Sequence, residues 1–205
     1  PLPLTTTTPR SRRSPTNSPP PDQRPPQCYI RPAGGYVCLG EVLNNTENVW
    51  ENVQVRVNLY DRDSYLIATQ IIALEQRRIA AQSTAPYHVS FTDTVQEPSS
   101  TRTLLYRKQR VDDAPSNLSI AEERGVLAEN GRYILTARIA NQNPSALRDI
   151  RAIVTLFDEN DTVIGYRIYP VTNSLASDET ATIRVEIIPI IQSDDISHRL
   201  VLDYR

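Results

Sequence analysis

The 205-residue sequence is poor in the residues that build most catalytic and cofactor sites. Its two cysteines and two histidines form no Cys/His cluster of the zinc type, for which a structural site takes four such ligands. Its six glycines form no GxGxxG or GxxxxGK arrangement, so no phosphate-binding loop is indicated. No apolar run approaches the roughly 20 residues that span a bilayer. We therefore expect a non-enzymatic protein with no catalytic residues, no metal, no cofactor and no membrane span.

Methionine is also absent, and the sequence opens on Pro1. This favours an exported protein whose signal peptide has been cleaved, with a truncation made in cloning as the alternative. The expected location is extracellular or at the cell surface.

The net charge of −2 hides a difference between the start of the chain and the rest. Residues 1–27 carry four arginines against one aspartate, a net of +3, which leaves −5 for residues 28–205. A nucleic-acid-binding domain is typically basic, with clustered Lys and Arg and interleaved aromatics. We therefore expect no nucleic-acid partner.

The two cysteines flank a turn. In the segment CYIRPAGGYVC, a hairpin symmetric about Ala33 places Ile30 opposite Tyr36 and Cys28 opposite Cys38. Facing Cα atoms of an antiparallel pair lie about 4.5 to 5.5 Å apart, within the reach of a disulfide. We predict a Cys28–Cys38 disulfide and an oxidising compartment, with two buried free thiols as the alternative.

The sequence matches itself when it is shifted by 97 residues. Residues 40–72 lie over residues 137–169, and the matched positions include Asn44 with Asn141. After one deleted residue the match continues, with Ala85 on Ala181. Matched spacing over roughly 60 positions predicts two copies of one domain.

Both copies have the pattern of a β domain. Apolar residues alternate with polar ones from Val53 to Leu59 and again from Ala181 to Ile187, as in strands with one buried face. We expect six strands in each copy, over residues 28–30, 36–43, 53–61, 65–73, 85–92 and 103–111 in the first, and over 125–127, 132–140, 149–158, 162–170, 181–188 and 198–205 in the second.

Short strands at this spacing predict an all-β fold with two tandem antiparallel β-sandwiches, because each half-apolar sheet must cover its face with another. The expected domains are a Pro/Thr/Ser-rich tail over residues 1–27, a first sandwich over 28–111, a linker over 112–124 and a second sandwich over 125–205. Within the linker, Ser119 and Glu122 suit a capping box for one helical turn.

The segments VNLYD at 57–61 and VTLFD at 154–158 each follow an apolar strand that carries Asn44 or Asn141, and each precedes a polar turn. This arrangement resembles the FxLYD domain, an immunoglobulin-like module of exported bacterial and archaeal proteins. The resemblance covers both repeats but not the tail, and both copies have Val in place of the first Phe. It implies an immunoglobulin-like sandwich in a cell-surface setting, and it implies no reaction.

The tail over residues 1–27 holds nine of the 16 prolines and only two large apolar residues. Such a segment cannot offset its ordering entropy alone and favours disordered or polyproline-like conformations. Leu2, Leu4, Thr6 and Thr8 alternate with proline and threonine, and threonine favours β structure. We expect these four residues to contact a neighbouring subunit as an added strand, for which six strands per sandwich leave room. A Thr/Ser/Pro stalk is the alternative.

Three asparagines, the tryptophan and the two histidines are further candidate functional residues. Asn44, Asn117 and Asn160 stand in N-x-S/T sequons and are candidate glycosylation sites. The only tryptophan, Trp50, either plugs one end of the first sandwich or projects toward a partner. His88 and His198 lack companions that indicate catalysis.

The acidic turns are also candidates for calcium. Asp61 and Asp63 in the first copy match Asp158, Asn160 and Asp161 in the second. Asp and Asn favour such turns for backbone reasons, so we expect turn formers and not metal ligands.

These features predict a structural subunit of an extracellular filament or surface assembly. Its partners would be copies of itself, joined by an N-terminal arm that packs on, or donates a strand to, the next subunit. The alternative is a monomeric surface module, adhesive or glycan-binding, on a flexible stalk.

Overall fold

The computed structural model describes residues 23–93, 96–112, 117–191, 193 and 195–204. These residues form strands and connecting turns but no helix, and so none of them lies in a helix that could cross a membrane. The strands of the first repeat are β1 (Gln27–Ile30), β2 (Tyr36–Asn44), β3 (Val49–Tyr60), β4 (Leu66–Ala73), β5 (Arg78–Ile79), β6 (Ser83–Phe91) and β7 (Ser100–Val111). Those of the second are β8 (Leu118–Leu127), β9 (Tyr133–Asn141), β10 (Leu147–Phe157), β11 (Val163–Leu175), β12 (Thr180–Ile187) and β13 (Ser197–Asp203).

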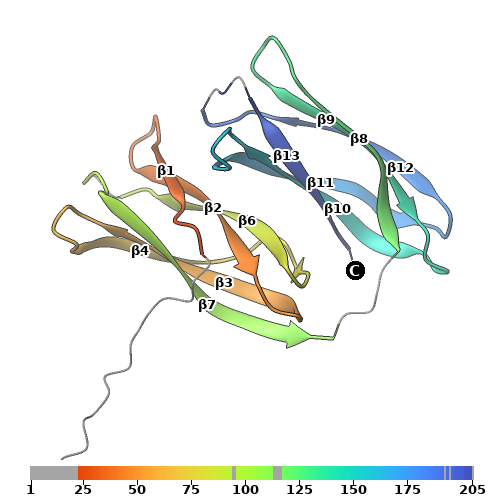
Figure 1. Ribbon diagram of the computed structural model, residues 1–205, viewed down its shortest axis with the longest axis horizontal. Coiled ribbons are helices and arrows are strands. Elements are labelled where there is room, and N and C mark those ends of the chain that lie inside the picture. The colour runs from red at the N-terminus through yellow and green to blue at the C-terminus, as the bar shows by residue number, and fades with distance from the viewer. Residues whose placement is uncertain (1–22, 94–95, 113–116, 192, 194, 205) are drawn as a thin grey trace, which may run out of the picture.

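The strands form four antiparallel sheets, two in each repeat (Figure 1). In the first repeat, β1-β2-β6 faces a sheet in which β3 pairs with β4, β5 and β7. In the second, β12-β9-β8 faces β11-β10-β13. The fold is therefore all-β, and its sheets form the two tandem sandwiches that the sequence predicts.

Each sandwich has its own apolar core. Inward-facing residues of β2, β3 and β6 fill the first, and those of β9, β10 and β12 fill the second. Alternation explains this burial, because successive strand residues point to opposite faces of a sheet. Trp50 is 3% exposed and belongs to the first core, so it fills the interior of the first sandwich and does not project toward a partner. The Lys108 ammonium lies 3.6 Å from its ring centroid.

The linker prediction is wrong in its second half. β8 begins at Leu118 and pairs with β9 up to Leu127, so residues 118–124 are strand. Ser119 and Glu122 consequently lie in a strand and not in a helical turn. The two-residue strand β5 was not predicted, because a pair of residues has no periodicity.

The repeat is visible in the backbone itself. Non-glycine residues with positive φ occur at equivalent places in the two sandwiches: Asn52 with Asp149, Ser64 with Asp161, and Gln82 with Asp178. A β-bulge at Leu59/Tyr60 recurs at Leu156/Phe157. Because left-handed backbone is uncommon outside glycine, matching positions of this kind indicate two copies of one domain.

The acidic turns repeat in the same way. Oδ1 of Asp61 accepts the backbone amides of Asp63 and Tyr65, and Oδ1 of Asp158 accepts those of Asn160 and Thr162. Both aspartates therefore close a hairpin turn through their side chains, as the backbone argument predicts.

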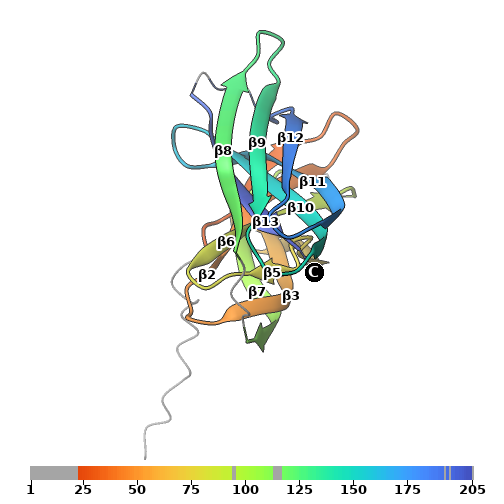
Figure 2. The ribbon, with the colours of Figure 1, turned by 90° about the vertical axis from the view of Figure 1, so that its right-hand side faces the viewer.

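Figures 1 and 2 show the two sandwiches stacked side by side, with β1-β2-β6 of the first next to β11-β10-β13 of the second. A small apolar cluster of Leu39, Phe157 and Val163 is buried between them, with Tyr29 and Tyr166 at its margin. The molecule is thus four sheets deep, and its two repeats share a contact surface.

Candidate functional site

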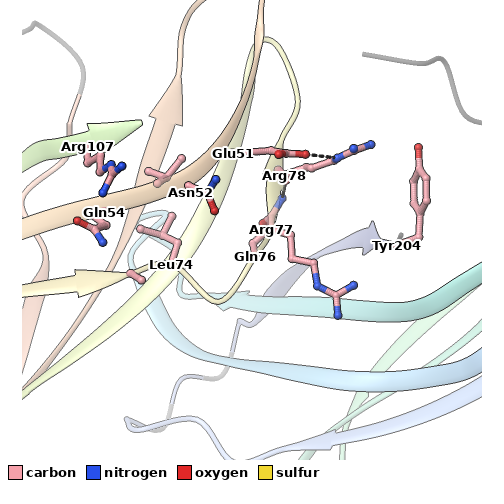
Figure 3. Close-up of a pocket in the computed structure, with 11 residues that line it drawn as sticks. Glu51, Asn52, Gln54, Leu74, Gln76, Arg77, Arg78, Arg107 and Tyr204 are labelled. Atoms are coloured by element: carbon pink, nitrogen blue, oxygen red, sulfur yellow. Dashed lines mark hydrogen bonds and ion pairs between the residues drawn. The ribbon is translucent and has the colours of Figure 1, made fainter. Parts of the chain in front are cut away.

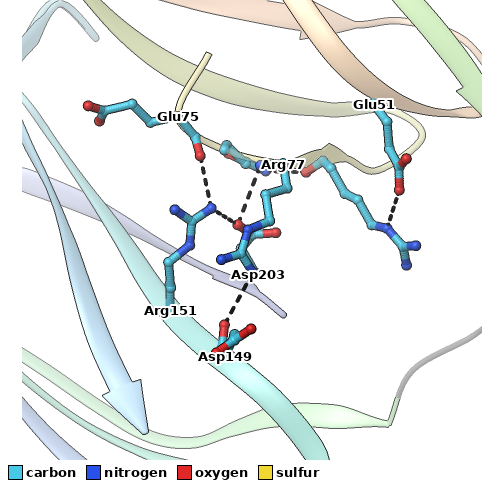
Figure 4. Close-up of polar contacts among 8 residues, drawn as sticks. Glu51, Glu75, Arg77, Asp149, Arg151 and Asp203 are labelled. Carbon is cyan, nitrogen blue, oxygen red and sulfur yellow. Dashed lines mark hydrogen bonds and ion pairs between the residues drawn. The ribbon is translucent and has the colours of Figure 1, made fainter. Parts of the chain in front are cut away.

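The contact between the sandwiches is reinforced by a polar cluster (Figure 4). Asp203, at the end of β13, is 3% exposed and forms an ion pair with Arg151 of β10. The same Arg151 donates to the carbonyl of Glu75 in the first sandwich, at 2.9 Å. The backbone amide of Arg77 donates to Oδ2 of Asp203, and its guanidinium donates to the carbonyl of Asp149. The loop after β4 is thereby tied to two strands of the second sandwich.

A second set of contacts lies on β2 and β6. Arg199 of β13 forms an ion pair with Glu41 at 2.6 Å and also donates to Thr84. Burial raises the pKa of Glu41, and the Arg199 charge opposes this shift. Nδ1 of His88 lies 2.6 Å from the hydroxyl of Tyr166, which also donates to Glu75.

Tyr29 of β1 crosses the same boundary. Its hydroxyl donates to the carbonyl of Val163 in the second sandwich, at 3.3 Å. Burial, and next the negative charge of Asp158, raise the pKa of Tyr29 to about 12. The phenol therefore stays protonated and keeps its donor at physiological pH. These contacts, with the apolar cluster, join the repeats into one block.

A polar hollow of about 650 Å³ opens beside this block (Figure 3). Arg107 and Tyr204 stand on opposite sides of it. Arg78 pairs with Glu51 at 2.6 Å, and Arg77 belongs to the cluster above. Among the described residues, none forms a hydrogen bond or ion pair with the Arg107 side chain, so its guanidinium is available to a ligand in this hollow.

A second hollow lies at the end of the junction where β1 ends. We call it the isoleucine groove: a space of about 810 Å³ lined by β1, by residues 97–101 leading into β7, and by Ile190 and Ile191 of the second sandwich. Ile190 also lines an adjoining hollow, together with Ile188. Four exposed isoleucines therefore gather here, with exposed fractions of 73% at Ile30, 67% at Ile188, 43% at Ile190 and 38% at Ile191.

The isoleucine groove also adjoins the start of the described chain. Pro25 and Pro26 form part of its lining, and Oγ1 of Thr101 donates to the carbonyl of Pro26. On the neighbouring side, Gln23 donates to the carbonyl of Leu43, and Arg24 donates to that of Asp161. The described chain begins at Gln23, beside Leu43 toward the end of β2 away from Tyr36, so Pro25 and Pro26 form the part of the groove that is nearest to the N-terminal tail in sequence.

The predicted disulfide is confirmed. The Cys28 and Cys38 sulfurs are bonded, and the pairing of Cys28 with Cys38 and of Ile30 with Tyr36 is the predicted register. The bond fastens β1 to β2 next to the isoleucine groove. The predicted subunit contacts Leu2, Leu4, Thr6 and Thr8 lie outside the described residues.

The three sequons differ in access. Asn117 and Asn160 are exposed and remain candidate glycosylation sites. Asn44 is fully buried, and its amide nitrogen donates to the carbonyls of Asn48, Ile79 and Ala80. The proposed glycan at Asn44 is therefore incompatible with the folded domain, because the nitrogen that would carry it already bonds three carbonyls.

Both histidines are held by tyrosines. Nδ1 of His198 lies 2.6 Å from the Tyr133 hydroxyl, and its Nε2 lies 2.8 Å from Glu123. Burial, with the Glu123 charge, raises the pKa of Tyr133. A phenol with a raised pKa is a poor nucleophile, so this trio is better suited to joining β8, β9 and β13 than to chemistry.

Sequence reasoning missed the isoleucine groove. Its signal is the run IIPII at 187–191, which is more apolar than a loop after a strand requires. The other half, at β1, lies more than 150 residues away in sequence, so only the fold brings the two together.

No protein-family model matches the chain, and no curated protein matches its sequence. Among solved structures, it is similar to the exo-chitosanase CsxA of Amycolatopsis orientalis, with 11% identity, a TM-score of 0.30, and coverage of 88% of this chain and 25% of that one. It is also similar to red sea bream transglutaminase, with 11% identity, a TM-score of 0.25, and coverage of 89% and 29%. The chain thus spans between a quarter and a third of the length of these proteins. At this distance the likeness carries no argument about activity.

Proposed function

We propose that the chain is a non-enzymatic structural subunit of an extracellular filament or surface assembly. Its N-terminal arm, within residues 1–22, packs on or donates a strand to a neighbouring copy. The resemblance to FxLYD modules of exported proteins belongs to this proposal, as does the exported location.

The observation that carries the proposal is the gathering of Ile30, Ile188, Ile190 and Ile191 on one surface. They come from both sandwiches and line two adjoining hollows. Exposed apolar side chains that cluster in this way favour contact with another protein. An arm with two leucines at its far end precedes Pro25 and Pro26, which line one of these hollows.

Two other features support an assembly. A subunit must transmit its orientation to the next, and the buried Asp203–Arg151 ion pair and the Leu39–Phe157–Val163 cluster hold the two sandwiches in one arrangement. The Cys28–Cys38 disulfide suits an oxidising compartment, since such bonds are rare in the reducing cytosol.

Deletion of residues 2–8 tests the proposal. We expect the parent chain to form polymers, visible by negative-stain electron microscopy and by sedimentation. The deleted chain should keep a folded circular-dichroism spectrum and remain at single-copy mass, because the arm is the link. As a matched control, a chain with residues 14–20 shuffled should still polymerise. Polymers of normal length from the deleted chain would refute the proposal.

The alternative is a monomeric adhesive or glycan-binding module on a stalk. The polar hollow with Arg107, Asn52, Gln54 and Tyr204 favours it, because these side chains can donate hydrogen bonds to hydroxyl or carboxylate groups. This function predicts one molecular mass at every concentration and protease cleavage within residues 1–22.

A further inference from the structure

We infer that the isoleucine groove, together with the open edge of β1, holds residues 2–8 of a second copy of this chain. This inference rests on the proposed function and names the surface that receives the arm.

β1 is an edge strand with unused backbone groups. It pairs only with β2, and the amide of Arg31 donates to the carbonyl of Gly35 across the hairpin. Hydrogen-bonded and non-bonded pairs alternate along an antiparallel ladder, so Cys28 and Ile30 fall in non-bonded pairs. Their amides and carbonyls therefore point away from β2, and none of the described residues forms a backbone hydrogen bond with them. An added strand would satisfy these groups.

The arm has a matching segment. Residues 4–8 are the five consecutive positions between Pro3 and Pro9, so each keeps its amide for a ladder, and β1 is four residues long. Alternation places Leu2, Leu4, Thr6 and Thr8 on one face. Two leucines on that face complement Ile190 and Ile191, which line the groove beside β1.

The distribution of charge favours the edge of β1 over the open edge of β7 as the site that binds the arm. The outer edge of β7 belongs to a strand with Arg102, Arg107, Lys108 and Arg110, whereas the arm carries arginines at positions 10, 12 and 13. Like charges disfavour pairing there, and lysine and arginine commonly protect exposed edges. The isoleucine groove instead has Glu97 in its lining, on a body with a net charge of −5.

The position where the arm begins favours binding of residues 2–8 in the groove of a second copy over binding in the groove of the same chain. Pro25 and Pro26 already line the groove, and six prolines stand between Thr8 and Pro26. Proline-rich chain favours the extended polyproline conformation, at about 3.1 Å per residue, so the 17 residues from Pro9 to Pro25 would span about 50 Å. An extended arm delivers residues 2–8 far from its own groove. A head-to-tail contact of this kind does not close on itself, and it builds a filament.

Complementation between two defective chains tests the inference. The groove variant is Ile30→Asp with Ile191→Asp, which places charge on exposed side chains in the groove and keeps the arm. The arm variant lacks residues 2–8 and keeps the groove. Each alone should remain at single-copy mass in sedimentation velocity. Mixed in equal amounts, they should form a one-to-one dimer that does not extend, because only one arm and one groove are intact.

A matched control uses another exposed apolar strand. Leu66→Asp with Ile71→Asp on β4 adds the same two charges away from the groove, at side chains that are 54% and 44% exposed. This chain should assemble as the parent does, whereas the groove variant should lose at least about tenfold in association constant. Circular dichroism must show that all variants are folded like the parent.

The outcomes separate the two claims. A parent chain that stays at single-copy mass at every concentration contradicts the proposed function, and this inference with it. A parent that assembles, beside a groove variant that assembles equally well, contradicts the inference alone. If the mixture forms no dimer, the arm does not bind the groove of another copy, and the inference is wrong. If only the β4 control loses assembly, the surface that receives the arm is on β4, and the inference is again wrong.

Discussion

A buried asparagine holds the same corner of both sandwiches. Asn141 is fully buried like Asn44, and its amide nitrogen donates to the carbonyls of Ser145, Leu175 and Ala176. The sequence repeat indicates this structural role. Asn44 stands in a sequon, whereas its counterpart Asn141 is followed by Gln142 and Asn143 and does not. A residue kept in both copies while its sequon is not kept is better explained by structure than by glycosylation.

Substitution of either asparagine should destabilise its own sandwich. Asn44→Ala or Asn141→Ala leaves three carbonyls without their shared donor, one of which, that of Ile79 or Leu175, belongs to the buried last residue of a strand. We expect the free energy of unfolding, measured by chemical denaturation, to fall by about 3 kcal/mol in each case. Asn173→Ala, at an exposed position of β11, is the matched control and should change it by less than about 0.5 kcal/mol. Equal effects at all three positions would contradict this role.

At the scale of the element, most strands follow from alternation. Eleven of the thirteen described strands lie where the sequence predicts a strand, because one face of each sheet is buried and the other is not. The start of β8 was misassigned, since Ser119 and Glu122 suit a helix cap and the adjacent turn residues suit a linker. β1 is four residues long and its counterpart β8 is ten, and Pro25 and Pro26 explain the difference because they lack the amides that a ladder needs.

The disulfide should contribute much of the stability of this short strand. Cys28 and Cys38 are ten residues apart, and closing a loop of that length stabilises a domain by about 3 kcal/mol through the entropy of the unfolded chain. We expect Cys28→Ala with Cys38→Ala to lower the free energy of unfolding of the first sandwich by about this amount, and to weaken assembly, because β1 is loosened. Unchanged stability after this double substitution would contradict the assigned role of the bond.

At the scale of the molecule, the stacking of the sandwiches could not be predicted. Its contacts join residues far apart in sequence, such as Glu75 with Arg151 and Glu41 with Arg199. Neither periodicity nor spacing reports on such pairs, although the sequence does indicate two domains and an arm. The isoleucine groove was missed for the same reason, since its two halves are brought together only when the sandwiches pack.

The central claim is that the arm of one copy covers the open edge of β1 in the next. Hydrogen–deuterium exchange measures the protection of the amides on this edge directly. The comparison is between the assembled chain and the chain lacking residues 2–8. We predict that the amides of Cys28 and Ile30 exchange at least about tenfold more slowly in the assembly, since each gains a hydrogen bond. Their repeat counterparts on β8, Gly125 and Leu127, should exchange equally in both. Unchanged exchange at Cys28 and Ile30, or protection at Gly125 and Leu127 in their place, would contradict the account.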